Sequence, residues 1–180
     1  GGLSYRYNDS SYNFNIGIDG QYANLEGNQV YPRVFALDRS FKNILPNAMF
    51  NYKFTRTKNL RVMYRSSTNP PGISQLQNVV DITNPLLLKT GNPALVQDYD
   101  HRIMLRYGAT NTRTSRNFFA FGMVQFTQDY IGNATFIPTK DTVINDGLVV
   151  NRGTQINMPV NLDGYMNGRA YLTYGFPVKA

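Results

Sequence analysis

Segments with alternating polar and apolar residues recur along this chain, and the connections between them alternate strictly between short and long. Alternation with period two, bounded by clusters of Asn, Gly, Asp, Ser and Thr, is typical of β-strands. The predicted strands are Leu3–Asn8, Tyr12–Leu25, Ile44–Thr55, Asn59–Ser67, His101–Ala109, Asn117–Ile131, Gln155–Leu162 and Arg169–Phe176. The pattern therefore predicts an all-β chain, an antiparallel up-and-down meander of about eight long strands.

The predicted connections fall into two classes. Four are short turns: Asp9–Ser11, Arg56–Lys58, Asn111–Ser115 and Asp163–Gly168. Three are long loops: Gly27–Asn43, Thr68–Asp100 and Gly132–Arg152. In a meander the two classes lie at opposite ends, and membrane barrels place short turns at one rim and long loops at the other. Most of the predicted strands are long for a soluble sandwich, but their length suits a tilted membrane crossing.

Two predicted strands on either side of the longest loop mirror each other in side-chain pattern. Successive strand residues point to opposite faces. One face of this pair would carry a cationic row with methionines inside it, namely Arg61, Met63, Arg65, Arg102, Met104 and Arg106. The other face would be apolar and aromatic, with Val62, Tyr64, Ile103, Leu105 and Tyr107. An apolar outside and a polar inside predict the wall of a transmembrane β-barrel.

Composition agrees with one lipid-facing surface. Charged residues make up 16% of the 180 residues, which is low, while aromatic residues make up 13%, which is high. The formal net charge is +7, but the basic residues are spread singly along strands and turns, which argues against nucleic-acid binding. The chain has no cysteine, so it contains neither a disulfide framework nor a thiolate metal site.

The sequence offers little for catalysis. His101 is the single histidine, and a Ser-His-Asp relay would need it to act with Asp98 or Asp100, yet no nucleophile elbow is present. No segment has the spacing of a calcium loop, a zinc site or a phosphate-binding glycine loop. We predict a protein that is not an enzyme, with no catalytic residues, metal or cofactor.

The predicted cationic wall, Arg61, Arg65, Arg102 and Arg106, has two interpretations. Unpaired guanidinium groups facing a lumen would attract an acidic solute through bidentate pairing. Alternatively, the four side chains pair with acidic groups elsewhere in the lumen, including those of a plug. This second interpretation is favoured because a charge inside a protein is costly unless it is paired. Tyrosines near strand ends would form interfacial girdles or, in a soluble protein, stack on carbohydrate; the candidates are Tyr12, Tyr22, Tyr64, Tyr99, Tyr107 and Tyr130.

The longest loop carries a recognisable series of short motifs. They are Asn69-Pro70-Pro71, Gln75-Leu76, Asn84-Pro85-Leu86 and Gly91-Asn92-Pro93-Ala94-Leu95. Taken together with the strands on either side, this series resembles the barrel of TonB-dependent receptors of Bacteroidetes type, in particular their outer membrane protein β-barrel family. The motifs cover roughly residues 59–110, and the flanking hairpins match only in their rhythm.

The resemblance implies a barrel of about 22 strands, of which residues 3–180 would be a slice in the outer membrane of a Gram-negative cell. Such receptors take up siderophores, vitamin complexes, glycans or peptides, with energy delivered by TonB to an N-terminal plug. Lipid, the solute, the plug and TonB are the implied partners. External loop residues that could contact the solute are Asn69, Gln75, Asn92, Asp98 and Tyr99. Gly1 and Gly2 look like an artificial edge, with the natural start upstream and the plug-bearing part missing.

Three alternatives stay open at the level of sequence. A complete, small eight-stranded barrel would serve a structural or adhesion role, although its arginine-rich interior would be hard to fill. A soluble β-sandwich would bind glycans through tyrosine. A remote alternative is an anion-binding or nucleic-acid module, whose binding would depend steeply on salt.

Overall fold

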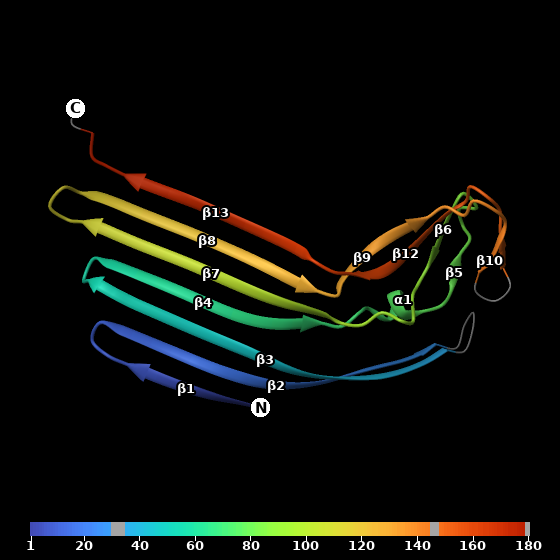
Figure 1. Cartoon of the computed structure of the whole chain (residues 1–180), viewed down its shortest axis with the longest axis horizontal. Coiled ribbons are helices and arrows are strands. Elements are labelled where there is room, and N and C mark those ends of the chain that lie inside the picture. Colours follow the sequence, from blue (N-terminus) through green and yellow to red (C-terminus); the bar gives the residue numbers. More distant parts are fainter. Residues whose placement is uncertain (30–34, 145–147, 179–180) are drawn as a thin grey trace.

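A computed structural model describes residues 1–29, 35–144 and 148–178 of the chain. Most strands form one seven-stranded antiparallel sheet (Figure 1). In spatial order these are β1 (Gly2–Asn8), β2 (Tyr12–Gln29), β3 (Phe35–Thr55), β4 (Lys58–Asn69), β7 (Asp98–Asn111), β8 (Arg116–Gln128) and β13 (Tyr165–Gly175). The predicted all-β antiparallel meander is confirmed.

The connections of this sheet are sorted by length between its two ends. The connections β1–β2, β3–β4 and β7–β8 are short and lie together at one end, on the left of Figure 1. The long excursions between β4 and β7 and between β8 and β13 lie at the other end. In the described chain β1 and β13 are the two edges of the sheet and do not pair with each other. The sheet is therefore open, and the small closed eight-stranded barrel does not form.

The two long excursions pack together into what we call the excursion module, residues 70–97, 129–144 and 148–164. The first contains α1 (Ile73–Leu76), β5 (Val80–Asp81) and β6 (Leu87–Thr90), and the second contains β9 (Tyr130–Phe136), β10 (Thr142–Ile144), β11 (Leu148–Val150) and β12 (Gln155–Leu162). A four-stranded sheet of order β5-β6-β12-β9 joins them, with β6 and β12 parallel. Buried apolar residues of the described chain lie in this module, namely Leu76, Leu88, Leu95, Val150 and Ile156.

The large sheet of the described chain has seven strands, and one of the eight predicted segments lies outside it. The segment Gln155–Leu162 does not join the large sheet, because β6 and β9 pair with it on either side within the module. The predicted strand Asn117–Ile131 is broken at Asp129, whose φ of 52° is rare for a residue with a side chain. Opposite this break lies Gly164, with a φ of 76°. The β8–β13 hairpin therefore bends where it becomes the β9–β12 hairpin (Figure 1).

Three predicted connections are also shorter than expected. The loop Gly27–Asn43 is mostly strand, because β2 and β3 pair as far as residues 29 and 35; Pro32 lies outside the described residues. The loop Thr68–Asp100 loses residues 68–69 to β4 and 98–100 to β7. The turn Asp163–Gly168 is replaced by β13 from residue 165 onwards. The strands extend beyond the segments with alternating side chains, because backbone hydrogen bonds between strands do not require apolar side chains.

The strand registers give the large sheet two chemically different faces. Arg61 lies opposite Arg106 and Arg65 lies opposite Arg102, so all four arginines share one face, which we call the polar face. The other, apolar face carries residues such as Val62, Ile16, Leu105, Val124 and Leu172. It is uncovered, and Leu172 is 73% exposed. The register also settles the facing of β8, whose even-numbered residues 118–126 lie on the apolar face.

Candidate functional site

Three of the four arginines of the predicted wall have polar or aromatic partners within the sheet. Arg61 Nε donates to Asn51 Oδ1 at 2.6 Å, and Arg102 Nη2 donates to Gln125 Oε1 at 3.2 Å. The guanidinium of Arg106 lies 5.1 Å from the centre of the Phe119 ring. Within the part of the chain that the structure describes, no carboxylate forms an ion pair with any of the four. Their positive charge is therefore available to a partner outside these residues.

One end of the polar face carries an acidic group held by neutral donors. Asp100 is only 7% exposed. Its carboxylate accepts hydrogen bonds from Thr127 Oγ1, from Gln125 Nε2 at 2.9 Å and from Asn69 Nδ2 at 3.3 Å. Gln125 thus connects Arg102 to Asp100 through its amide. His101 points to the opposite face of the strand, beside Tyr64, so the two acids proposed for a catalytic relay do not reach it.

The five predicted loop residues all take part in hydrogen bonds, either within the excursion module, at its base, or between strands of the large sheet. Asn69 binds Asp98 Oδ1 through both its backbone N–H, at 3.0 Å, and its side-chain amide, at 2.8 Å. Gln75 Oε1 accepts from the Gly72 N–H at 2.8 Å. Asn92 Nδ2 donates to the Pro159 carbonyl at 3.1 Å, and the Tyr99 hydroxyl donates to the Ile44 carbonyl at 2.6 Å. Each of the five residues therefore has a hydrogen-bond partner within the described chain, and solute contact by them stays a prediction.

The residue types in the motifs of the longest loop are explained by how the loop packs and turns. Leu76 and Leu95 are 0% exposed and fill the space beneath the loop. A side chain at Gly91 would place its Cβ 2.2 Å from the Gln77 carbonyl oxygen, so only glycine fits there. The next residue, Asn92, turns the chain by accepting the Ala94 N–H at 2.9 Å.

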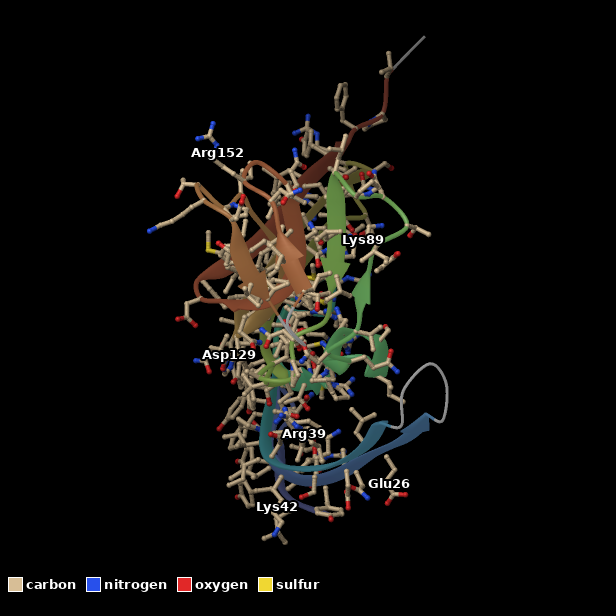
Figure 2. All side chains as sticks on the ribbon, turned by 90° about the vertical axis from the view of Figure 1, so that its right-hand side faces the viewer. Glu26, Arg39, Lys42, Lys89, Asp129 and Arg152 are labelled. Atoms are coloured by element: carbon tan, nitrogen blue, oxygen red, sulfur yellow. The ribbon has the colours of Figure 1, made fainter. Side chains whose placement is uncertain are left out.

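Two polar residues that the sequence prediction missed attach the loop to the rest of the molecule. Arg39, on β3, donates to the carbonyl oxygens of Leu95, at 2.8 Å, and of Pro93. Asn161, on β12, accepts the Val96 N–H and donates to the Val96 carbonyl, both at 3.0 Å. Figure 2 shows Arg39 on the side of the β2–β3 hairpin that faces the module, whereas Lys42 points away from it. Neither residue belongs to a local motif, so no sequence signal marks them.

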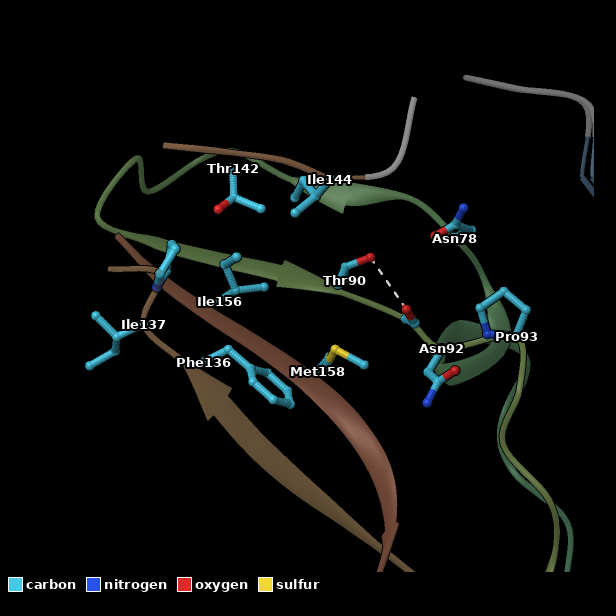
Figure 3. Close-up of a pocket in the computed structure, with 12 residues that line it drawn as sticks. Asn78, Thr90, Asn92, Pro93, Phe136, Ile137, Thr142, Ile144, Ile156 and Met158 are labelled. Atoms are coloured by element: carbon cyan, nitrogen blue, oxygen red, sulfur yellow. Dashed lines mark hydrogen bonds between the residues drawn. The ribbon is translucent and has the colours of Figure 1, made fainter. Parts of the chain in front are cut away.

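A pocket of about 550 Å³ opens between the two excursions (Figure 3). Its walls are mainly apolar and come from Phe136, Ile137, Ile144, Ile156 and Met158. Thr90 and Asn92 add polar groups at one end. A mainly apolar cavity with a few oriented polar groups is the usual form of a small-molecule site. This pocket was not predicted, because its lining residues come together only when the excursions pair.

The apolar face carries aromatic rings near both ends of the strands. Near the short turns, Phe54 contacts Tyr107 with ring centres 6.2 Å apart, and Tyr107 contacts Phe118 at 6.0 Å. Toward the module, the Tyr64 hydroxyl lies 2.8 Å from His101 Nδ1. Tyr99 lies beside His101 on the same face, with ring centres 4.8 Å apart, whereas Tyr130 stacks on Tyr165, which its register with Thr127 places on the polar face. Two aromatic levels on one apolar surface correspond to the two interfaces of a bilayer.

The described residues contain no group of three or more His, Asp and Glu side chains placed to hold a metal ion. Within the same residues, no helix has the length and hydrophobicity that a membrane span requires.

Comparison with known proteins agrees with this two-faced sheet. No curated protein sequence matches the chain. Among solved structures, a hemophore receptor of Serratia marcescens, HasR, determined as a double mutant in complex with its hemophore HasA and heme, has the same fold with a TM-score of 0.54 and 13% identity. The match covers 91% of this chain and 28% of that receptor chain, so this chain spans little more than a quarter of that receptor's length.

A family model gives the assignment. The model of the outer membrane protein β-barrel family matches residues 1–179, nearly the whole chain. This confirms the resemblance to the outer membrane protein β-barrel family and the outer-membrane location that the sequence indicated. The chain belongs to the outer membrane protein β-barrel family.

Proposed function

We propose that the chain is one part of the wall of a TonB-dependent receptor that takes up a solute across the outer membrane. The observation that carries this proposal is the open, two-faced sheet, which has an uncovered apolar face, a cationic polar face and a packed module at one end. In this arrangement the apolar face contacts lipid, the polar face lines the lumen, and the module lies outside the cell.

The two edges of the sheet support a larger barrel. β1 and β13 each have one neighbour in the described sheet, so each leaves a row of backbone N–H and C=O groups without a strand partner on its outer side. Such groups are costly within a bilayer, where water cannot bind them, and closure with further strands removes the cost. The receptor that shares the fold is more than three times as long as this chain, which leaves room for those strands.

The polar face and the module support uptake. The four arginines have no acidic partner in the described chain, which fits a lumen that receives its counter-charge from a solute or from a plug. The module is packed and cross-linked, so its apolar pocket is formed before any solute arrives. The proposed role is binding and transport without chemical conversion, with energy supplied through the plug by TonB.

An excision of the first excursion tests this proposal. Asn69 and Asp98 face each other at the end of the β4–β7 ladder, so an Asn-Gly turn can replace residues 70–97 without disturbing the strands. Cells carrying the wild-type or the excised receptor would be screened for uptake of ferric siderophores, cobalamin and oligosaccharides. We expect the excised receptor to reach the outer membrane and to lose uptake of the solute that the wild type imports. Undiminished uptake would rule out a role of the module in solute capture.

A further inference from the structure

A second cavity lies on the polar face at the end with the short turns, far along the strands from the excursion module. It has a volume of about 700 Å³. Four cationic residues line it, two from the strand faces and two from the β3–β4 turn region: Arg61, Arg106, Lys53 and Arg56. None of its described lining residues is acidic. We call this cavity the turn-end pocket.

The turn-end pocket differs in charge from the other half of the arginine wall. Arg65 lines a separate cavity that also contains Asp19. Arg102 is connected through Gln125 to Asp100. The half of the wall near the module therefore has acidic groups close by, whereas the turn-end half has only amides and an aromatic ring among its described neighbours.

Neutral groups hold the two arginines of the turn-end pocket in place. Asn51 Nδ2 donates to Asn13 Oδ1 at 2.7 Å, which leaves Asn51 Oδ1 to accept from Arg61 Nε at 2.6 Å. Phe119 lies beneath the Arg106 guanidinium, which is opposite Arg61 in the register. The Nη–H groups of both arginines donate to no acceptor among the described residues, so they are free to bind a ligand. Such prearranged donors bind an anion with little loss of side-chain entropy.

A glycine keeps the floor of the pocket open. Gly108 lines the cavity two residues after Arg106, on the same face of β7. A Cβ at this position would lie 3.4 Å from Asn59 Oδ1 and touch nothing else within 4 Å, so a larger side chain fits the backbone but extends into the cavity.

We propose that the turn-end pocket binds an anionic group, a carboxylate or a phosphate, of a solute that passes along the lumen. This inference rests on the proposed function, in which the short turns lie at the periplasmic rim. It therefore assigns the class of solute, an acidic one, and a site near the exit of the pathway. The volume of the cavity is that of a small-molecule site, which favours a solute over a flat protein surface as the occupant.

Titration of the intact receptor in detergent tests the site. The probes are inorganic pyrophosphate and citrate, which separate phosphate from carboxylate recognition, with sucrose as the neutral control. The double variant Arg61→Gln/Arg106→Gln removes two charges within the pocket. The matched variant Arg65→Gln/Arg102→Gln removes two charges from the same strands and the same face, outside it. Gly108→Leu fills the cavity and leaves the charge unchanged.

We expect one or both anions to bind, and the pocket double variant to weaken that binding by about 10-fold or more, because charge-assisted hydrogen bonds are lost. Gly108→Leu should weaken it comparably, whereas the matched variant should change it by less than about 3-fold. Equal losses in the two double variants would show a diffuse positive field and overturn the site.

Two further results bear on the proposal. If the wild type binds neither anion, while the pocket variant and Gly108→Leu lower the thermal stability of the receptor, an acidic protein segment occupies the pocket and the solute proposal is wrong. Heat-modifiable migration and membrane extraction are measured on the same samples. If the wild type does not insert into membranes, the uptake function fails, but the titration of folded protein still decides whether the pocket binds anions.

Discussion

The large sheet and the excursion module bury their apolar residues in opposite ways. On the sheet, apolar side chains such as Leu172 and Ile16 stay 73% and 54% exposed, and no second layer covers them in the described chain. In the module, Leu76 and Leu95 are completely buried, and Leu88, Val150 and Ile156 form a small shared core. One continuous chain thus contains two kinds of apolar surface.

The difference teaches that the two regions fold in different solvents. A lipid-facing sheet needs no core of its own, because the hydrocarbon of the bilayer takes the place of the second layer. The module extends beyond the strands into water, where apolar residues are stabilised only by packing against one another. It therefore has the buried leucines and the cross-linking amides of a small soluble domain.

The comparison is tested most strongly by removing a buried leucine from the module. Leu95→Ala should destabilise the module by about 2–5 kcal/mol, because truncation of this fully buried side chain leaves a cavity. The matched change Leu172→Ala, on the apolar face of the sheet, should cost much less, since lipid chains fill the gap. Hydrogen exchange of the excursion amides, with the receptor in lipid, measures the first effect. Similar losses of stability at both positions would show that the module and the sheet do not differ in how their apolar residues are stabilised.

A charge placed on either face of one strand tests the lipid assignment. Phe50→Lys puts an ammonium on the apolar face of β3 and should cost about 2–4 kcal/mol if that face contacts the middle of the bilayer. Met49→Lys puts the same charge on the polar face of the same strand and should be tolerated. Urea unfolding in phospholipid vesicles compares the two. Equal destabilisation would show that the faces do not differ in solvent.

A smaller effect is expected where the module is held by a side-chain amide. Asn161→Ala removes both hydrogen bonds to the Val96 peptide and the 2.7 Å bond to the Asp129 carbonyl, leaving these backbone groups without partners. We expect a loss of about 1–3 kcal/mol, seen as faster exchange of the Val96 amide.

The control for this change is Asn157→Ala, on the same strand, which removes a single exposed bond to Thr135 and should change little. If the two variants exchanged alike, the amide contacts of Asn161 would not hold the module.

The smallest effect concerns a carboxylate of the module. Hydrogen bonds from the Thr83 hydroxyl and, at 3.0 Å, from its backbone N–H lower the pKa of Asp81. A lowered pKa stabilises the folded state above the unfolded pKa, which is about 3.9, and this contribution is lost as the pH falls through the folded pKa. Thr83→Val should move the pKa of Asp81 upward toward its ordinary value, as read from a carboxyl NMR titration. An unchanged pKa would mean that the hydroxyl is not the main cause.

The wall was predictable because its determinants are local. The alternation of residues in segments such as Asn59–Ser67 predicts both that the segment is a strand and which residues share a face. The register between β4 and β7 confirms that Arg61, Arg65, Arg102 and Arg106 lie on one face. The same rule failed for Gln155–Leu162, which alternates equally well but belongs to the module. Alternation shows that a strand has two environments, and it does not show which sheet the strand joins.

The module and its contacts were beyond local patterns. Arg39 reaches carbonyl groups more than fifty residues away, and the lining of the apolar pocket combines residues from both excursions. The loop residues Asn69, Gln75 and Asn92 were predicted to contact a solute, and this stays a prediction. In the structure Asn69 binds Asp98, Gln75 accepts from the Gly72 N–H, and Asn92 donates to the Pro159 carbonyl. Sequence marked them as unusual but could not distinguish support from recognition, because both roles use the same amide chemistry.

The sequence by itself determined that this protein is a meander of two-faced strands, since side-chain direction along a strand follows from the period of the backbone. Tertiary structure alone decided that the two excursions form one packed module, and that the hairpin of β8 and β13 bends at Asp129 and Gly164. It also decided that carboxylates lie near one half of the arginine wall and none lines the cavity at the other half. These features depend on contacts between residues far apart in the chain, and such contacts are fixed by chain topology and packing, on which a local pattern carries no information.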